Sequence, residues 1–122
     1  MIDLKAIKSI AVVGASNNEA KTGYKIVVNL KSRGYKVYPI NLKENEILGL
    51  KVYPNLAALP HKPDLVDIVV PPEIAVQIVH QAVDMKIDNI WLQPGAEFKE
   101  LAQIIEKNPQ INFVSQSCIM MN

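Results

Sequence analysis

The residues best suited to bind an anion lie where an apolar run gives way to a helical pattern. Residues 10–13 are Ile-Ala-Val-Val, a Gly-Ala-Ser turn follows at 14–16, and Lys21 and Thr22 precede an amphipathic stretch. A helix N-terminus offers unpaired backbone N–H groups and the positive end of a dipole. The turn at residues 14–24 is therefore predicted to bind a phosphate, with Thr22 as the helix N-cap.

Three more segments are expected beside this turn, because the carboxyl ends of parallel strands meet at one edge of a sheet. They are residues 41–43, 70–74 and 93–97. A dinucleotide site would need G-x-G-x-x-G and an acidic residue at the end of the second strand, but only Gly14 fits and that strand ends in Asn-Leu-Lys. Lys43 suits a phosphate on an adenosine ribose. The predicted ligand is coenzyme A or, less well, NADP.

The residues predicted to contact this ligand come from all four segments. They are Gly14, Ala15, Ser16, Asn17, Lys21, Thr22, Gly23, Tyr24, Asn41, Lys43, Val70, Pro71, Pro72, Ile74, Gln93, Pro94 and Gly95.

The elements that must position these residues alternate between strand and helix. Strands are predicted from Ile10 and over 35–40, 64–70, 88–93 and 111–114. Helices are predicted over 23–33, from Pro72 to about Val83, and along an apolar face at Phe98, Leu101, Ala102, Ile104 and Ile105. A short helix is expected at 3–8, an extended piece at 49–53, a helical turn at 55–59 and a tail at 115–122. Gly34 is the expected C′ residue of the first long helix, and Pro72 is expected in the first turn of the second.

This alternation predicts an α/β fold, with a doubly wound parallel five-stranded sheet of Rossmann-like type in the order 3-2-1-4-5 and three α/β/α layers. A length of 122 residues fits one domain over 1–122.

Charge is distributed unevenly along the chain. Residues 1–43 hold eight basic and two acidic residues, a net +6, and the rest holds five and ten, a net −5. The basic residues follow a βαβ pattern without interleaved aromatic residues, which favours a compact anionic ligand over nucleic acid. No apolar run approaches the ~20 residues of a membrane helix and no signal peptide is visible, so no membrane partner and a cytoplasmic location are expected. Cys118 is the single cysteine, which excludes an internal disulfide and a multi-cysteine zinc site.

Six motifs carry a family resemblance along nearly the whole chain. They are Val12-Val13-Gly14-Ala15-Ser16, Gly34-Tyr35-Lys36-Val37-Tyr38-Pro39-Ile40-Asn41, Ile47-Leu48-Gly49, Pro71-Pro72, Trp91-Leu92-Gln93-Pro94-Gly95 and Cys118-Ile119. The chain resembles the small single-domain CoA-binding protein family, whose domain is similar to the N-terminal domain of the succinyl-CoA synthetase α subunit. The resemblance implies that residues 14–16 and Lys21 hold the pyrophosphate and that Asn41 and Lys43 hold the phosphorylated ribose. It also implies that the Pro71-Pro72 and Gln93-Pro94-Gly95 segments flank the adenine and pantetheine groove.

No motif of catalysis accompanies these features. The sequence lacks HExxH, G-x-S-x-G and a Cys–His pair with supporting spacing, and Asp64 and Asp67 are expected at the beginning of the third strand, away from the site. Ligation of the succinyl-CoA synthetase type also needs a phosphorylated histidine from a second domain and a nucleotide-binding partner, which this chain does not encode.

We therefore predict that the protein binds CoA or acyl-CoA as a carrier, buffer or sensor, and that it is not an enzyme. The alternatives are an NADP-binding sensor or reductase-like domain, and a detached subunit that works with a separately encoded catalytic partner. An exposed apolar patch at residues 119–121 would favour that subunit or a homodimer.

Overall fold

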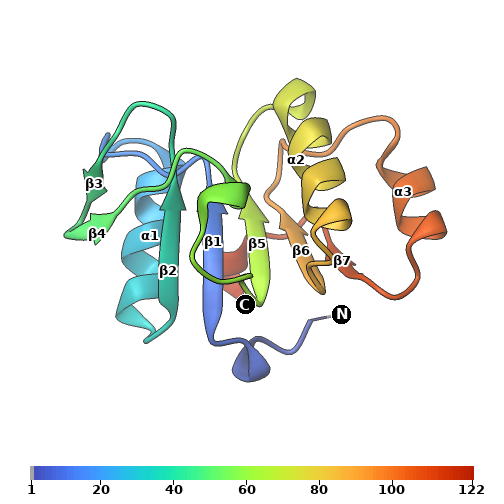
Figure 1. The fold of residues 1–122 in the computed structure, drawn as a ribbon, viewed down its shortest axis with the longest axis horizontal. Helices are drawn as coiled ribbons and strands as arrows, with labels where there is room; N and C mark the ends of the chain where they lie inside the picture. Colours follow the sequence, from blue (N-terminus) through green and yellow to red (C-terminus); the bar gives the residue numbers. More distant parts are fainter. Residues whose placement is uncertain (1) are drawn as a thin grey trace.

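Five parallel strands cross the middle of the molecule in the computed structural model, which describes residues 2–122 (Figure 1). The strands are β1 (Ser9–Val13), β2 (Lys36–Ile40), β5 (Leu65–Ile68), β6 (Asn89–Leu92) and β7 (Asn112–Val114). Their order in the sheet is β2-β1-β5-β6-β7. The predicted five-stranded parallel α/β sheet is confirmed.

The predicted order of the strands, 3-2-1-4-5, is wrong. The third of the five, β5, pairs with β1 and not with β2: Ile10 lies opposite Leu65, and Val13 lies opposite Ile68. The reason is the long connection 41–63, which packs Ile47 on one side of the sheet and Leu56 on the other and so delivers β5 to the far side of β1. Strand order consequently reverses between β1 and β5.

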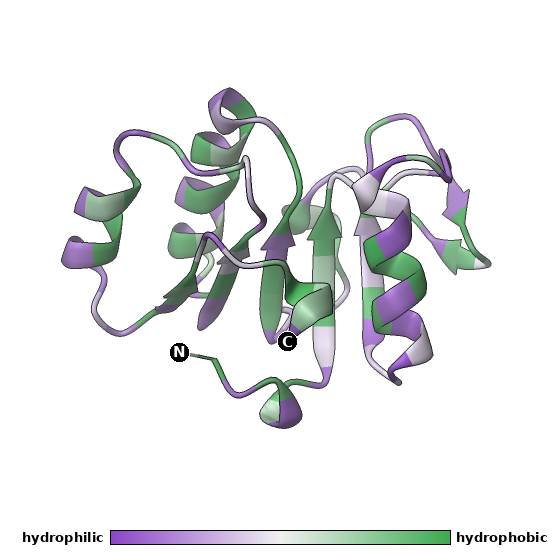
Figure 2. Cartoon of the chain, turned by 180° about the vertical axis from the view of Figure 1, so that it is seen from behind, coloured by the Kyte–Doolittle hydropathy of each residue, from purple (hydrophilic) through white to green (hydrophobic). Residues whose placement is uncertain are grey.

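Helices cover both faces of the sheet. On one face lie α1 (Thr22–Ser32), the 3-10 turn η1 (Leu4–Ala6) and the 3-10 turn η3 (Ile119–Met121); on the other lie α2 (Pro72–Asp84), α3 (Leu101–Lys107) and η2 (Leu56–Ala58). Figure 2 shows hydrophobic residues, in green, within the strands and a mixture of green and purple residues along the helices. The two apolar cores follow the alternation of β1, whose Ala11 and Val13 face α2 while Ile10 and Val12 face α1.

The ends of the helices mostly follow the predicted signals. Gly34, at φ +91°, ends α1 with bonds from its N–H to Lys31 O and from the Tyr35 N–H to Leu30 O, the pair that defines a Schellman motif. Pro72 is the first residue of α2, as predicted. The predicted apolar face of α3 is only partly buried: Leu101 and Ile104 face the core, but Ala102 and Ile105 are exposed.

The irregular region between β2 and β5 contains a hairpin in place of the single extended piece expected at 49–53. Strands β3 (Glu46–Ile47) and β4 (Leu50–Lys51) are antiparallel and stand beside β2 at one end of the sheet (Figure 1). The turn between them needs two positive φ angles, 51° at Leu48 and 78° at Gly49, as in a type I′ hairpin. The helical turn expected at 55–59 is present as η2.

Residues 115–122, named here the tail segment, fold back onto the α1 face. Ile119 is fully buried and Met120 packs against the same core, while Met121 is 84% exposed. The exposed apolar patch considered for residues 119–121 therefore does not form. Within residues 2–122, no helix has the length and apolar character needed to cross a membrane.

Candidate functional site

A cavity of about 1080 Å³ opens at the carboxyl ends of β1, β5 and β6, where strand order reverses. Open α/β sheets bind their ligands at such a crevice. Loops from every part of the chain line it: Gly14, Ala15, Ser16, Ala20, Lys21, Thr22, Gly23, Lys25, Asn41, Val69, Val70, Pro71, Pro72, Gln93, Pro94, Gly95, Ala96, Cys118 and Met120. All four segments predicted from the sequence therefore contribute to one cavity.

Two glycines bring helix α1 directly onto the end of β1. A Cβ on Gly23 would lie 2.0 Å from Gly14 O, and a Cβ on Gly14, which has φ +103°, would lie 2.3 Å from Val69 O. Neither position tolerates a side chain without movement of the backbone. These glycines thus place the first turn of α1 at the floor of the cavity.

Among residues 2–122, no side chain caps the N-terminus of α1. The expected N-cap, Thr22, is instead the first helical residue, because Lys21 already has the extended backbone of a cap (φ −86°, ψ 147°), and Lys21 makes no capping bond through its side chain. Within residues 2–122, the N–H groups of Thr22 and Gly23 donate to no acceptor. Both residues line the cavity, so these donors and the helix dipole are available to an anion there.

Asn41 joins the turn after β1 to the loop after β2. Its Nδ2 donates to Ala15 O at 2.8 Å, and its Oδ1 accepts from the N–H groups of Lys43 at 2.7 Å and Glu44 at 3.1 Å. A few residues away, Asn17 Nδ2 donates to Glu44 Oε2 at 2.6 Å. The Glu44 carboxylate therefore lies near the end of β2, but it is bonded to Asn17 and is not among the groups that line the cavity.

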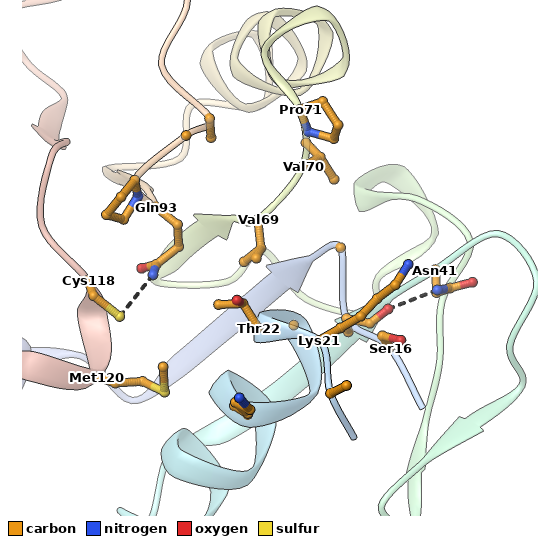
Figure 3. A pocket seen from close by; sticks show the side chains of 18 of the residues that line it. Ser16, Lys21, Thr22, Asn41, Val69, Val70, Pro71, Gln93, Cys118 and Met120 are labelled. Atoms are coloured by element: carbon orange, nitrogen blue, oxygen red, sulfur yellow. Dashed lines mark hydrogen bonds between the residues drawn. The ribbon is translucent and has the colours of Figure 1, made fainter. Parts of the chain in front are cut away.

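Gln93, a buried amide at the end of β6, forms the opposite wall together with the tail segment. Its Oε1 accepts from the Ile119 N–H at 2.9 Å, and its Nε2 donates to Cys118 Sγ at 3.1 Å. Figure 3 shows Gln93, Cys118 and Met120 on one side of the cavity and Ser16, Lys21 and Asn41 on the other. The cavity thus has one side with lysines and Asn41 and another side with Gln93 and two sulfur atoms.

Most of the predicted contact residues line the cavity, and a few lie beside it. Asn17, Tyr24, Lys43 and Ile74 are the predicted residues that are absent from its walls. The cavity also contains residues that were not on the list of predicted contacts: Ala20 and Ala96, which lie within the predicted segments, and Lys25, Val69, Cys118 and Met120, which lie outside them. Lys25 could have been found, because it lies one helical turn after Lys21, whereas nothing in the spacing of the sequence indicates that Cys118 and Met120 approach β1 and α1.

Two aspartates were expected at the beginning of the third strand, and only Asp64 lies there. Its Oδ2 accepts from the N–H groups of Lys8 at 2.8 Å and Ser9 at 3.1 Å, away from the cavity. Asp67 lies inside β5 between Val12 and Trp91, is fully buried, and has no partner for either carboxyl oxygen within residues 2–122. Burial raises the pKa of Asp67 well above its ordinary value, so this carboxyl group is favoured in its neutral form.

Other reactive groups are dispersed. His61 and His80 are exposed and do not line the cavity. In the part of the chain that the structure describes, no three residues among His, Cys, Asp and Glu are arranged to hold a metal ion.

Comparison with known proteins identifies the family. Residues 8–122 match the family described as "CoA binding domain". The chain belongs to this CoA-binding family. Among curated relatives, the α subunit of an ADP-forming acetate–CoA ligase II from Pyrococcus furiosus is 34% identical over 111 residues, and that match covers 82% of this chain. The chain spans only 24% of the length of that ligase subunit.

The similar solved structures include one of nearly the same length as this chain and one that is much longer. A conserved hypothetical protein from Pyrococcus furiosus has a TM-score of 0.87 and 39% sequence identity; the match covers 93% of this chain and 97% of that one. A dinucleotide-forming acetyl-coenzyme A synthetase of Ca. Korarchaeum cryptofilum, solved with phosphate and ADP, has a TM-score of 0.74 and 29% identity, with 91% of this chain and 25% of that chain covered. The proteins similar to this chain therefore include one of nearly the same length and others that are much longer.

Proposed function

We propose that this member of the CoA-binding family binds coenzyme A or an acyl-CoA in the cavity described above, as a carrier, buffer or sensor without chemistry of its own. The observation that carries the proposal is the start of α1, where the N–H groups of Thr22 and Gly23 have no acceptor within residues 2–122 and are available to bind an anion. In a family of CoA-binding domains, the phosphates of CoA are the expected anion. A cavity of about 1080 Å³ is large enough for an extended nucleotide ligand.

The ligand is expected to lie with its pyrophosphate at Lys21 and the N-terminus of α1. Lys25 adds a second cation among the residues that line the cavity. We assign the phosphorylated ribose to the side of Asn41, where Lys43 extends from the same loop, and the pantetheine arm to the side of Gln93. In this arrangement the thiol or acyl end faces the wall formed by Cys118 and Met120.

A second candidate is a detached subunit that works with a separately encoded catalytic partner. The ligase relatives favour it, because this chain corresponds to about a quarter of a ligase α subunit. Binding of CoA is common to both candidates.

Thermal unfolding in the presence of CoA, dephospho-CoA, acetyl-CoA, NADP and NAD tests the proposal. A ligand at about 100 times its dissociation constant adds roughly 2.7 kcal/mol, which raises the midpoint by several degrees in a domain of this size. We expect a shift with CoA that is smaller with dephospho-CoA, and Lys43→Ala should remove that difference. A shift with NADP alone would make the NADP-binding alternative correct, and no shift with any of these ligands would overturn the proposal.

A further inference from the structure

The tail segment forms part of the cavity wall although it is distant in sequence from the other walls. Cys118 and Met120 line the cavity, and Ile119 between them is buried. The segment is held by Trp91, whose Nε1 donates to Ser117 O at 2.7 Å, and by Arg33, whose Nη1 donates to Ile119 O at 3.3 Å. The shape of this wall therefore depends on side chains that anchor the tail segment to the sheet and to α1.

Glu97 is the anchor that joins two walls of the cavity to each other. Its Oε1 accepts from the Gly95 N–H at 2.9 Å, and its Oε2 accepts from the Gln116 N–H at 3.0 Å. Gly95 lines the cavity, and Gln116 lies two residues before Cys118. One carboxylate thus ties the loop after β6 to the start of the tail segment, without lining the cavity itself.

The ionised form of Glu97 is the one that accepts both bonds most strongly. Burial alone would raise the pKa of Glu97, but hydrogen bonds from its own N–H group and from those of Gly95 and Gln116 outweigh that effect and lower the pKa. A carboxylate accepts at both oxygens, whereas a glutamine side chain has one acceptor oxygen and one NH2 group. Replacement of Glu97 by glutamine places the NH2 group of the new side chain against the N–H group of either Gly95 or Gln116, so one of the two hydrogen bonds is lost.

We propose that Glu97 is a positioning residue of the ligand site: its carboxylate holds the tail segment and the loop after β6 together, so that Cys118, Met120 and Gly95 form one wall for the ligand. This inference rests on the proposed binding of CoA. It also makes docking of the tail segment and binding of the ligand mutually stabilising, because each depends on the same wall.

Glu97→Gln tests the inference, with Glu100→Gln as the matched control. Glu100 lies three residues away, is exposed, and makes no hydrogen bond through its side chain within residues 2–122. Both substitutions remove one negative charge near the site. Because CoA is a polyanion, loss of a negative charge by itself would favour binding, so weaker binding by Glu97→Gln cannot be attributed to charge.

Two measurements without ligand report on the tail segment. One is the rate at which a thiol reagent labels Cys118, and the other is the emission of Trp91, the only tryptophan, whose indole N–H is bonded to Ser117 O. For Glu97→Gln we expect labelling that is several-fold faster and altered emission, with an unchanged far-UV circular dichroism spectrum. Saturating acetyl-CoA, whose sulfur is blocked and so does not consume the reagent, should slow the labelling again. Glu100→Gln should behave as the wild type.

The affinity for CoA is the third measurement. Loss of a hydrogen bond to a charged acceptor predicts a dissociation constant about tenfold higher for Glu97→Gln. If Glu97→Gln keeps the wild-type labelling rate, Trp91 emission and affinity, Glu97 does not position this wall. If the wild-type protein binds no CoA, the proposed function fails, while the two ligand-free measurements still decide whether Glu97 holds the tail segment.

Discussion

At the scale of a single residue, the buried carboxyl group of Asp67 makes stability depend on pH. The pKa of Asp67 is raised in the folded protein above its value of about 3.9 in an unfolded chain. Below the unfolded pKa both states are protonated and there is no penalty; above it the folded state keeps a proton that the unfolded state releases, so stability falls as the pH rises toward the folded pKa. We expect Asp67→Asn, which cannot ionise, to raise the free energy of unfolding more at pH 8 than at pH 5.

Urea unfolding at the two pH values measures this effect. Asp88→Asn is the control, because Asp88 is exposed and its side chain makes no hydrogen bond in the described part of the chain. An equal change for Asp67→Asn at pH 5 and pH 8 would show that Asp67 is not the source of the pH dependence.

At the scale of an element, the contact of α1 with the turn after β1 determines where the helix N-terminus lies. Gly23→Ala would place a Cβ 2.0 Å from Gly14 O, a contact that only a shift of the backbone can relieve. Overpacking of this kind costs about 1–3 kcal/mol of stability. We further expect weaker CoA binding, measured by calorimetry at a temperature where the variant is folded, because the free N–H groups of the first turn move with the helix.

Gly34→Ala is the control that separates the loss of stability in Gly23→Ala from its effect on CoA binding. Gly34 has a positive φ, but a Cβ added there would meet no atom of the described residues within 4 Å. Alanine therefore strains the other end of α1 by about 1–2 kcal/mol without a clash. Its affinity for CoA should match the wild type. Equal loss of affinity in both variants would mean that lowered stability, and not the placement of the N-terminus, weakens binding.

At the scale of the whole molecule, the histidines and the carboxyl groups within residues 2–122 lie outside the cavity. Both histidines are exposed and do not line the cavity. The carboxyl groups of Asp64 and Glu97 accept hydrogen bonds from backbone N–H groups, and that of Asp67 is buried inside β5. We expect the purified chain to form no acetyl-CoA from acetate, CoA and ATP with Mg²⁺, as measured by trapping the product with hydroxylamine. Turnover above that of a sample without protein would contradict the proposed function as a binding protein without chemistry of its own.

Local sequence patterns were sufficient to predict most elements of this fold. The apolar runs of β1 and β5, Gly34 at the end of α1 and Pro72 at the start of α2 depend on burial, on a positive φ or on a missing N–H, and each acts within a few residues. The same local signals placed the four loops at one edge of a parallel sheet, which is why most of the cavity was predictable.

The tertiary structure alone decided the features that depend on contacts between distant residues. The side on which β5 joins β1, the burial of Asp67 without a partner among residues 2–122, and the return of Cys118 and Met120 to the cavity are three such features. They arise from the long connection 41–63 and from bonds such as that between Gln93 and Ile119. A sequence records which residues are apolar or charged, but not which of two equally apolar strand edges a long loop reaches. The sequence by itself thus determined the strands, the helices and the lysines and helix N-terminus beside the cavity, whereas long-range packing determined the strand order and the wall of the cavity beside Glu97.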